Sequence, residues 1–107
     1  MKLSEKKCIP CEGGVPTLSK LSVKKYLKQL RGWKADSNKS ISKEFKFKNF
    51  IHTMGFVNQV SMIAQAENHH PDMHVHYSKV VIELSTHEVG GLTENDFILA
   101  AKIDQIK

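Results

Sequence analysis

The chain has six histidines, and three of them occupy positions that suit acid–base chemistry. His69 and His70 are adjacent and precede Pro71, and His87 follows later in a Ser-Thr-His-Glu run. Histidine has an unperturbed pKa of about 6.5, so it gives and takes protons near neutral pH, and it is also the commonest metal ligand. The pattern therefore indicates either general acid–base catalysis or a catalytic zinc ion held by three histidines. The spacing of the residues leaves both open.

The other three histidines are predicted to be exposed to solvent. His74 and His76 alternate with apolar residues, which places them on the polar face of a predicted strand. His52 lies in the first turn of a predicted helix. We expect these three side chains to be solvated.

The length and composition predict a single globular domain. The chain has 107 residues, of which 40% are hydrophobic and 25% are charged, and both shares are ordinary for a globular protein. No apolar run approaches the roughly 18 residues of a membrane helix, and residues 1–7 are too polar for a secretory signal. We therefore expect a cytoplasmic protein with no membrane partner, comprising a flexible N-terminal arm over residues 1–16 and one domain over residues 17–107.

The two cysteines, Cys8 and Cys11, form a single Cys-x-x-Cys motif. A structural zinc site needs four ligands, usually from two such pairs, and the sequence has no second pair. A thioredoxin-like motif would begin a helix after a strand, whereas Pro10 and Gly13-Gly14 surround this one. We interpret the pair as two free thiols in the arm.

The net charge of +5 is unevenly distributed. Residues 1–50 carry thirteen Lys and Arg against four Asp and Glu (+9), and residues 51–107 carry three against seven (−4). Such asymmetry can mark nucleic-acid binding. Here the lysines are scattered and no aromatic stacking motif accompanies them, so we expect a solvated basic face and no nucleic-acid partner.

Hydrophobic periodicity and capping residues predict seven elements in the order α-β-β-α-β-β-α. Ser19 can cap a first helix that ends at Arg31-Gly32, and Asn49 can cap a long helix that ends near Asn68. Strands are expected over residues 33–36, 41–47, 73–77 and 80–85, and a last helix follows Thr93. In the long helix, the apolar stripe is expected from Phe50, Met54, Val57, Ser61 and Ala64. Short turns between consecutive strands favour an α+β sandwich, in which helices pack on one face of a four-stranded antiparallel sheet.

The hairpin of the last two strands predicts which histidines meet. If Ser78 and Lys79 are its two turn residues, every inward-facing pair is apolar. These pairs are Tyr77 with Val80, Val75 with Ile82 and Met73 with Leu84. Continuing the same ladder places His70 opposite His87, with Cβ atoms about 4.5–5.5 Å apart.

Asp96, three residues after Thr93, has two possible roles. It can complete a capping box with Thr93 at the start of the last helix. Its carboxylate can also orient a histidine and favour the protonated ring. The two roles are compatible.

These residues resemble the signature of the pterin-4a-carbinolamine dehydratases. The matching positions are His69-His70-Pro71, an aromatic residue at Tyr77, Ser85-Thr86-His87 and Asp96. Gly32-Trp33, the region of Phe45, Phe47 and Phe50, and the run from Gly91 to Asp96 also match. The similarity extends from about residue 18 to residue 106.

The resemblance implies an α+β fold with a four-stranded antiparallel sheet. It also implies a hydro-lyase, 4a-hydroxytetrahydrobiopterin dehydratase. That enzyme dehydrates 4a-hydroxytetrahydropterin to quinonoid dihydropterin without a metal or cofactor, and so recycles the pterin of aromatic amino acid hydroxylases. Carried over, His69, His70 and His87 form the acid–base cluster and Asp96 supplies its carboxylate. The backbone around Ser85 and Thr86 helps to hold the pterin.

One position departs from the family pattern. Four residues before His69 the family usually carries an ionisable side chain, and here Gln65 can hydrogen-bond a pterin but cannot ionise. Activity is therefore expected, with a reduced rate or a shift toward another pterin as the alternatives that Gln65 leaves open.

The resemblance also implies partners. The family forms dimers, and tetramers in animals, so we expect a homo-oligomer that covers the edge strands of the sheet. Animal members also act as dimerisation cofactors of a transcription factor, so a non-catalytic interaction module is the alternative function.

Overall fold

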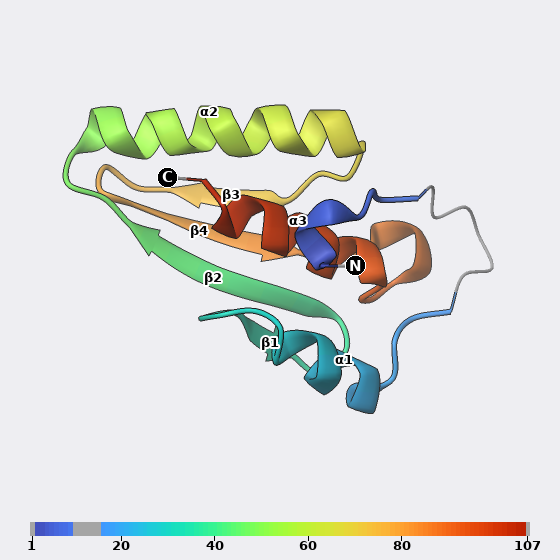
Figure 1. Ribbon diagram of the computed structural model, residues 1–107. Coiled ribbons are helices and arrows are strands. Elements are labelled where there is room, and N and C mark those ends of the chain that lie inside the picture. The colour runs from blue at the N-terminus through green and yellow to red at the C-terminus, as the bar shows by residue number, and fades with distance from the viewer. Residues whose placement is uncertain (1, 10–15, 107) are drawn as a thin grey trace.

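The computed structural model describes residues 2–9 and 16–106, and they form an antiparallel sheet covered by helices (Figure 1). The helices are α1 (Lys20–Leu27), α2 (Phe50–Glu67) and α3 (Glu94–Asp104). The strands are β1 (Lys34–Asp36), β2 (Ser40–Lys46), β3 (Asp72–Val75) and β4 (Lys79–Leu84), with short 3-10 turns η1 (Leu3–Glu5) and η2 (His87–Val89). The strands lie in the order β1-β2-β4-β3, and all neighbours are antiparallel. The predicted α+β class and element order are confirmed.

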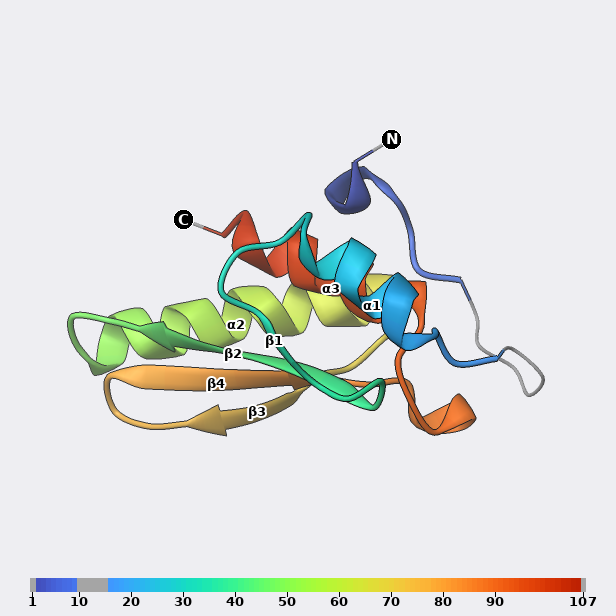
Figure 2. The same cartoon turned by 90° about the horizontal axis from the view of Figure 1, so that it is seen from below.

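The three helices lie on one side of the sheet (Figure 2). The central strand β4 alternates between buried and half-buried residues, and Val80, Ile82 and Leu84 have no solvent exposure. Those three side chains form the floor of the core, against which Val60 of α2 and Phe97 of α3 are buried. None of the helices in the described part of the chain has the length and apolar character needed to cross a membrane.

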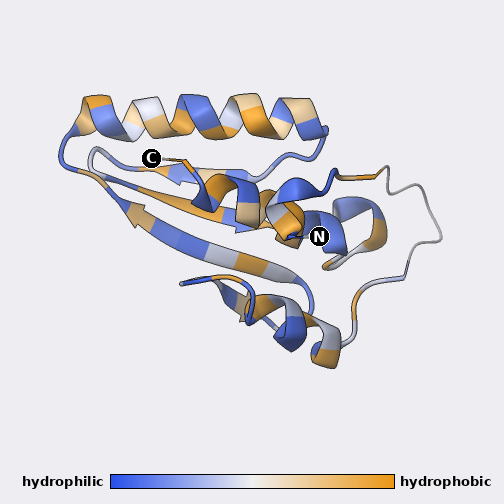
Figure 3. Ribbon diagram, in the orientation of Figure 1, coloured by the Kyte–Doolittle hydropathy of each residue, from blue (hydrophilic) through white to orange (hydrophobic). Residues whose placement is uncertain are grey.

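The predicted apolar stripe of α2 is wrong in part, since only its members Ala64 and Val57 are shown to pack in the core. The residues of α2 that are buried are Thr53, Phe56, Val60 and Ala64. Phe50 and Ser61, two members of the predicted stripe, are exposed. Periodicity misplaces the stripe because apolar residues occur on several faces of α2 (Figure 3), and because one buried residue is polar. The Thr53 hydroxyl is satisfied there, since its one proton is shared between the backbone carbonyls of Asn49 and Tyr77.

The predicted register of the β3–β4 hairpin is also wrong, by two residues. Val75 pairs with Val80 and Met73 pairs with Ile82. The turn is therefore formed by Tyr77 and Ser78, and the His76 N–H donates to the Lys79 carbonyl across it. Both registers put apolar residues on the same face because the side-chain period of a strand is two, so the pattern could not separate them.

Contacts with the rest of the fold support the observed register. The carbonyl of Ser78 accepts from the Phe47 N–H at 2.8 Å, and the carbonyl of Tyr77 accepts from the Thr53 hydroxyl at 2.9 Å. One consequence is that the ladder no longer places His70 opposite His87. β3 begins only at Asp72, opposite Glu83.

The start of the chain packs on the domain. Leu3 is buried in the core cluster, and η1 lies against α3 (Figure 1). The Cys8 N–H donates to a Glu67 carboxylate oxygen at 2.7 Å, and the Asn95 side chain bonds both the N–H and the carbonyl of Ile9. Residues 8 and 9, part of the arm that was expected to be flexible, are thus hydrogen-bonded to α2 and α3. The polar sequence of residues 2–9 gave no sign that their backbone would find hydrogen-bond partners on α2 and α3.

We expect Gly91→Ala to destabilise the protein and Gly55→Ala to stabilise it. A Cβ on Gly91 would lie 2.8 Å from Thr17 Cγ2 and 2.9 Å from the Asn38 carbonyl oxygen, a backbone atom that also accepts from the Leu92 N–H. Relieving this overlap costs about 1–3 kcal/mol.

Gly55 is the matched control, because it lies inside α2 and a Cβ there meets nothing within 4 Å. Alanine should raise the free energy of unfolding by about 0.5–1 kcal/mol. Urea unfolding of both variants measures the difference. A Gly91→Ala variant as stable as the unsubstituted protein would contradict the close approach.

Candidate active site

His69 is positioned by the way α2 ends. Asn68 adopts the left-handed conformation at φ 52°, which asparagine tolerates better than most residues. The Asn68 N–H donates to the Gln65 carbonyl, and the His69 N–H donates to the Ala64 carbonyl. These two bonds form a Schellman motif, which reverses the chain so that His69 lies against the start of α3.

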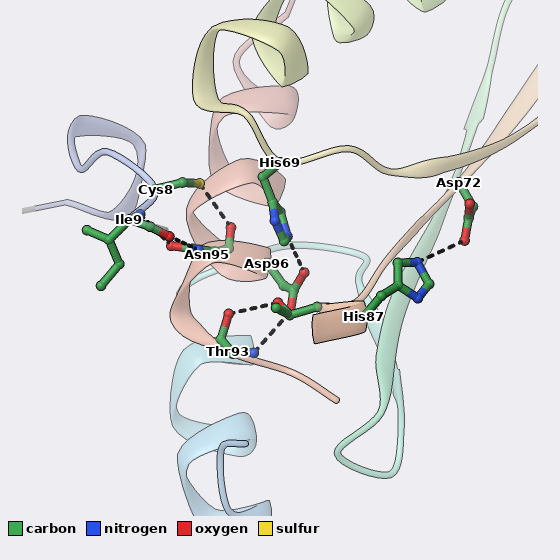
Figure 4. Close-up of polar contacts among 9 residues, drawn as sticks. Cys8, Ile9, His69, Asp72, His87, Thr93, Asn95 and Asp96 are labelled. Carbon is green, nitrogen blue, oxygen red and sulfur yellow. Dashed lines mark hydrogen bonds and ion pairs between the residues drawn. The ribbon is translucent and has the colours of Figure 1, made fainter. Parts of the chain in front are cut away.

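Asp96 is the buried acceptor at the centre of the site (Figure 4). Its carboxylate has no solvent exposure, and its Oδ1 lies 2.6 Å from Nε2 of His69. Its Oδ2 accepts from the Thr86 hydroxyl at 2.9 Å and from the Thr93 N–H at 3.0 Å. The predicted capping box of Thr93 and Asp96 is confirmed, and the same carboxylate contacts a histidine.

The hydrogen bonds at Asp96 determine which nitrogen of His69 remains for chemistry. An ionised carboxylate only accepts hydrogen bonds, so Nε2 of His69 must carry a proton and donate it to Oδ1. Nδ1 is then the nitrogen that gains or loses a proton. His69 is 9% exposed, so the ring is held by the protein and only a small part of it reaches the surface.

His70 follows His69 directly in the chain. It is exposed, and its Nε2 lies 3.1 Å from Oε1 of Gln65. An amide oxygen accepts hydrogen bonds, so Nε2 of His70 is the donor. Gln65, the residue that departs from the family pattern, therefore orients His70 without supplying a charge.

His87 lies in η2, beyond the end of β4, and its side chain is 74% exposed. Its Nε2 is 4.0 Å from Oδ2 of Asp72, the residue directly after His69-His70-Pro71 (Figure 4). The prediction that His87 faces His70 across the sheet is wrong, because the register differs and the chain leaves the sheet before His87. The structure instead brings His87 to Asp72 at the start of β3.

A cavity of about 290 Å³ lies beside His87, and Ser85, Thr86, Gly90 and Gly91 also line it. Ser85 is half-buried, whereas the Thr86 side chain is fully buried and points to Asp96. The expected pterin-binding segment therefore does two things. Its backbone borders the cavity, and the hydroxyl of Thr86 supports the carboxylate.

The three histidines do not converge as ligands for one ion. His69 contacts Asp96, His70 contacts Gln65, and His87 lies near Asp72. Within residues 2–9 and 16–106, no group of three or more histidine, cysteine or acidic side chains is arranged to hold a metal.

The remaining histidines and Cys8 lie as follows. His52, His74 and His76 are exposed, as predicted. Cys8 is half-buried with a free thiol, whose sulfur lies 3.6 Å from the Asn95 carbonyl oxygen. Cys11 lies outside the described residues.

Sequence reasoning missed two contacts at this site. The hydroxyls of Thr86 and Thr93 lie 2.8 Å apart, and Asp72 reaches toward His87. Asp72 could have been found from its place beside the double histidine. The paired hydroxyls carried no signal, because they are seven positions apart in the chain with the Gly90-Gly91 turn between them.

This α+β fold carries an acid–base site, in which a buried carboxylate holds one histidine and two exposed histidines lie on neighbouring segments. Comparison with known proteins gives its family. The family model described as pterin 4 alpha carbinolamine dehydratase matches residues 16–106. A relative from Nitrosomonas eutropha that carries the name of the same dehydratase is 51% identical over 105 residues, covering 97% of this chain and 92% of that one. A similarly named relative from Rickettsia canadensis is 48% identical over 103 residues, covering 95% and 94%.

Two solved structures share the fold. A Brucella melitensis protein described as a transcriptional coactivator/pterin dehydratase matches with a TM-score of 0.77 and 34% identity, covering 81% of this chain and 94% of that one. A pterin dehydratase-like RuBisCO assembly factor of the alpha-carboxysome matches with a TM-score of 0.59, covering 69% and 87%. It is 20% identical, and so shows the fold alone. The chain belongs to the pterin-4a-carbinolamine dehydratase family, which confirms the resemblance seen in its sequence.

We expect Cys8 to react slowly with alkylating reagents in the folded protein. Burial, assisted by the nearby negative charge of Glu67, raises the pKa of the thiol to about 12. Only the thiolate reacts, so at about pH 8 the reactive fraction is on the order of 10⁻⁴, and the rate should rise with pH up to that pKa. In a Cys11→Ser variant, iodoacetamide should modify Cys8 more than about tenfold more slowly in the native protein than in urea. Equal rates would show that residues 2–9 are not packed against α2 and α3 in solution.

Proposed function

We propose that this chain dehydrates a 4a-hydroxytetrahydropterin to quinonoid dihydropterin and water by histidine acid–base catalysis. The observation that carries the proposal is the buried His69–Asp96 pair at 2.6 Å, with His70 and His87 exposed on adjoining segments. Family membership supports the reaction class, and the names of the relatives support the pterin substrate.

The reaction needs two proton transfers. The bond between C4a and its hydroxyl oxygen breaks, and the departing oxygen takes up a proton to leave as water. Ring nitrogen N5 loses its proton, and its electrons form the C4a=N5 double bond. A positioned acid and a positioned base can each contribute roughly 10² to 10⁴ in rate.

We assign the acid role to His69. In its protonated form Nε2–H donates to Asp96, which stabilises the imidazolium, and Nδ1–H is the proton that can pass to the leaving oxygen. His87, near Asp72, and His70, beside Gln65, are the candidates to accept the N5 proton or hold the ring. Ser85 and Thr86, which the resemblance assigns to pterin binding, line the cavity beside His87.

The proposal predicts that His69→Ala loses most of its catalysis while His76→Ala keeps it. His76 is an exposed histidine at the far end of the hairpin, so it controls for the loss of an imidazole. We expect kcat above the spontaneous rate to fall by about 10² to 10⁴ in His69→Ala. An assay coupled to an aromatic amino acid hydroxylase measures the dehydration.

Two results would contradict this. Near-normal turnover in His69→Ala would remove His69 from the acid role. No acceleration by the unsubstituted protein would reject the dehydratase and favour an interaction module.

We also propose that the protein is a homo-oligomer. β1 and β3 are the edge strands of the sheet, and an uncovered edge is a template for pairing. Val75, the last residue of β3, is 42% exposed, and Tyr77 in the following turn is 76% exposed. Light scattering after size-exclusion chromatography should give at least twice the 12.1 kDa mass of one chain. A mass of one chain at micromolar concentration would reject the proposal.

A further inference from the structure

We propose that Thr86 is a positioning residue, whose hydroxyl holds Oδ2 of Asp96 and so aims Oδ1 at Nε2 of His69, which leaves Nδ1 as the working nitrogen. The effect on rate rests on the proposed function. The effect on the His69 ring does not, and it can be measured without substrate.

The direction of the hydrogen bonds follows from counting protons. The Thr86 hydroxyl has one proton, and it donates this proton to Oδ2 of Asp96. In its 2.8 Å contact with the Thr93 hydroxyl, Thr86 must therefore accept. The result is a directed chain from the Thr93 hydroxyl to the Thr86 hydroxyl to the Asp96 carboxylate.

Burial fixes the direction of the hydrogen bonds from Thr93 to Thr86 to Asp96. Thr86 and Asp96 are both fully buried, and Thr93 is 5% exposed. No buried side-chain polar atom in the described part of the chain lacks a partner. Water therefore has little access with which to replace any of these bonds, and losing one would cost the full desolvation of the group left behind.

Long-range pairing holds Thr86 in place. It lies just beyond β4 and forms an isolated bridge with Gly91, in which the Thr86 N–H donates to the Gly91 carbonyl at 3.0 Å. This bridge closes the η2 loop and brings the end of β4 beside the first turn of α3. The hydroxyl then meets Oδ2, which leaves Oδ1 for His69.

The consequence is clearest for Asp96→Asn. The Thr86 hydroxyl and the Thr93 N–H both donate, so the oxygen of the new amide must face them. Its NH₂ group then faces His69 and donates to Nε2, which can no longer carry a proton. Neutral His69 should therefore hold its proton on Nδ1, the opposite tautomer, and its protonated form loses its acceptor.

Enzyme kinetics test the positioning role of Thr86. We expect Thr86→Val to lower kcat by roughly 10- to 100-fold, the usual cost of losing a group that orients a reacting side chain, with KM changed less than about twofold. Thr86→Ser keeps the hydroxyl and should restore most of kcat.

Thr53→Val is the matched control, because Thr53 is equally buried and its one hydroxyl proton is shared between two backbone carbonyls away from the site. It should lower the melting temperature but leave kcat unchanged. A folded Thr86→Val with normal kcat, or a Thr53→Val with an equal loss of kcat, would overturn the proposal.

Nitrogen NMR tests the selection of Nδ1 as the working nitrogen of His69. It gives this result even if the Thr86→Val variant does not fold. Histidine labelled with ¹⁵N is incorporated, and the His69 signals are assigned by their loss in His69→Ala. Spectra are recorded well above the unperturbed histidine pKa of about 6.5. The unsubstituted protein should show the Nε2–H tautomer and Asp96→Asn the Nδ1–H tautomer. The Nε2–H tautomer in both proteins would overturn the proposal, whether or not the protein dehydrates a pterin.

Discussion

The buried carboxylate of Asp96 is the group on which the site depends. A carboxylate without solvent exposure is costly unless donors satisfy its oxygens. Here the donors come from three separate segments: His69 beyond α2, Thr86 beyond β4 and the backbone of Thr93 before α3. The ends of a helix, a strand and a second helix must therefore meet at one point, and the same bonds that stabilise the charge orient the histidine.

Several local devices bring those ends together. Asn68 ends α2 in a left-handed turn, so that His69 points back toward α3. The bridge between Thr86 and Gly91 closes the η2 loop. The backbone of Cys8 and Ile9 then joins Glu67 to Asn95, the residues two before His69 and one before Asp96. The N-terminal segment thus ties the two helices together beside the buried pair.

The three histidines differ in how firmly they are held. His69 is buried against a charge, whereas His70 and His87 are exposed beside a neutral amide and a partly exposed carboxylate. The sequence motifs did not distinguish the three histidines, because adjacency and spacing along the chain carry no information about how deeply a side chain is buried. The proposed hairpin contact between His70 and His87 failed for a related reason. Two registers of β3 on β4 bury the same face, and only contacts from Phe47 and Thr53 distinguish them.

The sequence by itself determined the elements, their order and the capped ends of α2 and α3, because the signals for these lie within a few residues of one another. It did not determine the end of α1, which was expected at Arg31-Gly32 and lies at Leu27. Asn49 caps α2, Asn68 ends it, and Thr93 with Asp96 begins α3. The histidine–proline signature likewise gave the family. Only the tertiary structure decided the hairpin register, the buried face of α2, the packing of residues 2–9 and the choice of His69 as the partner of Asp96. Each of these features depends on contacts between segments that are far apart in the chain. Each is therefore set by the packed arrangement that satisfies the buried polar groups.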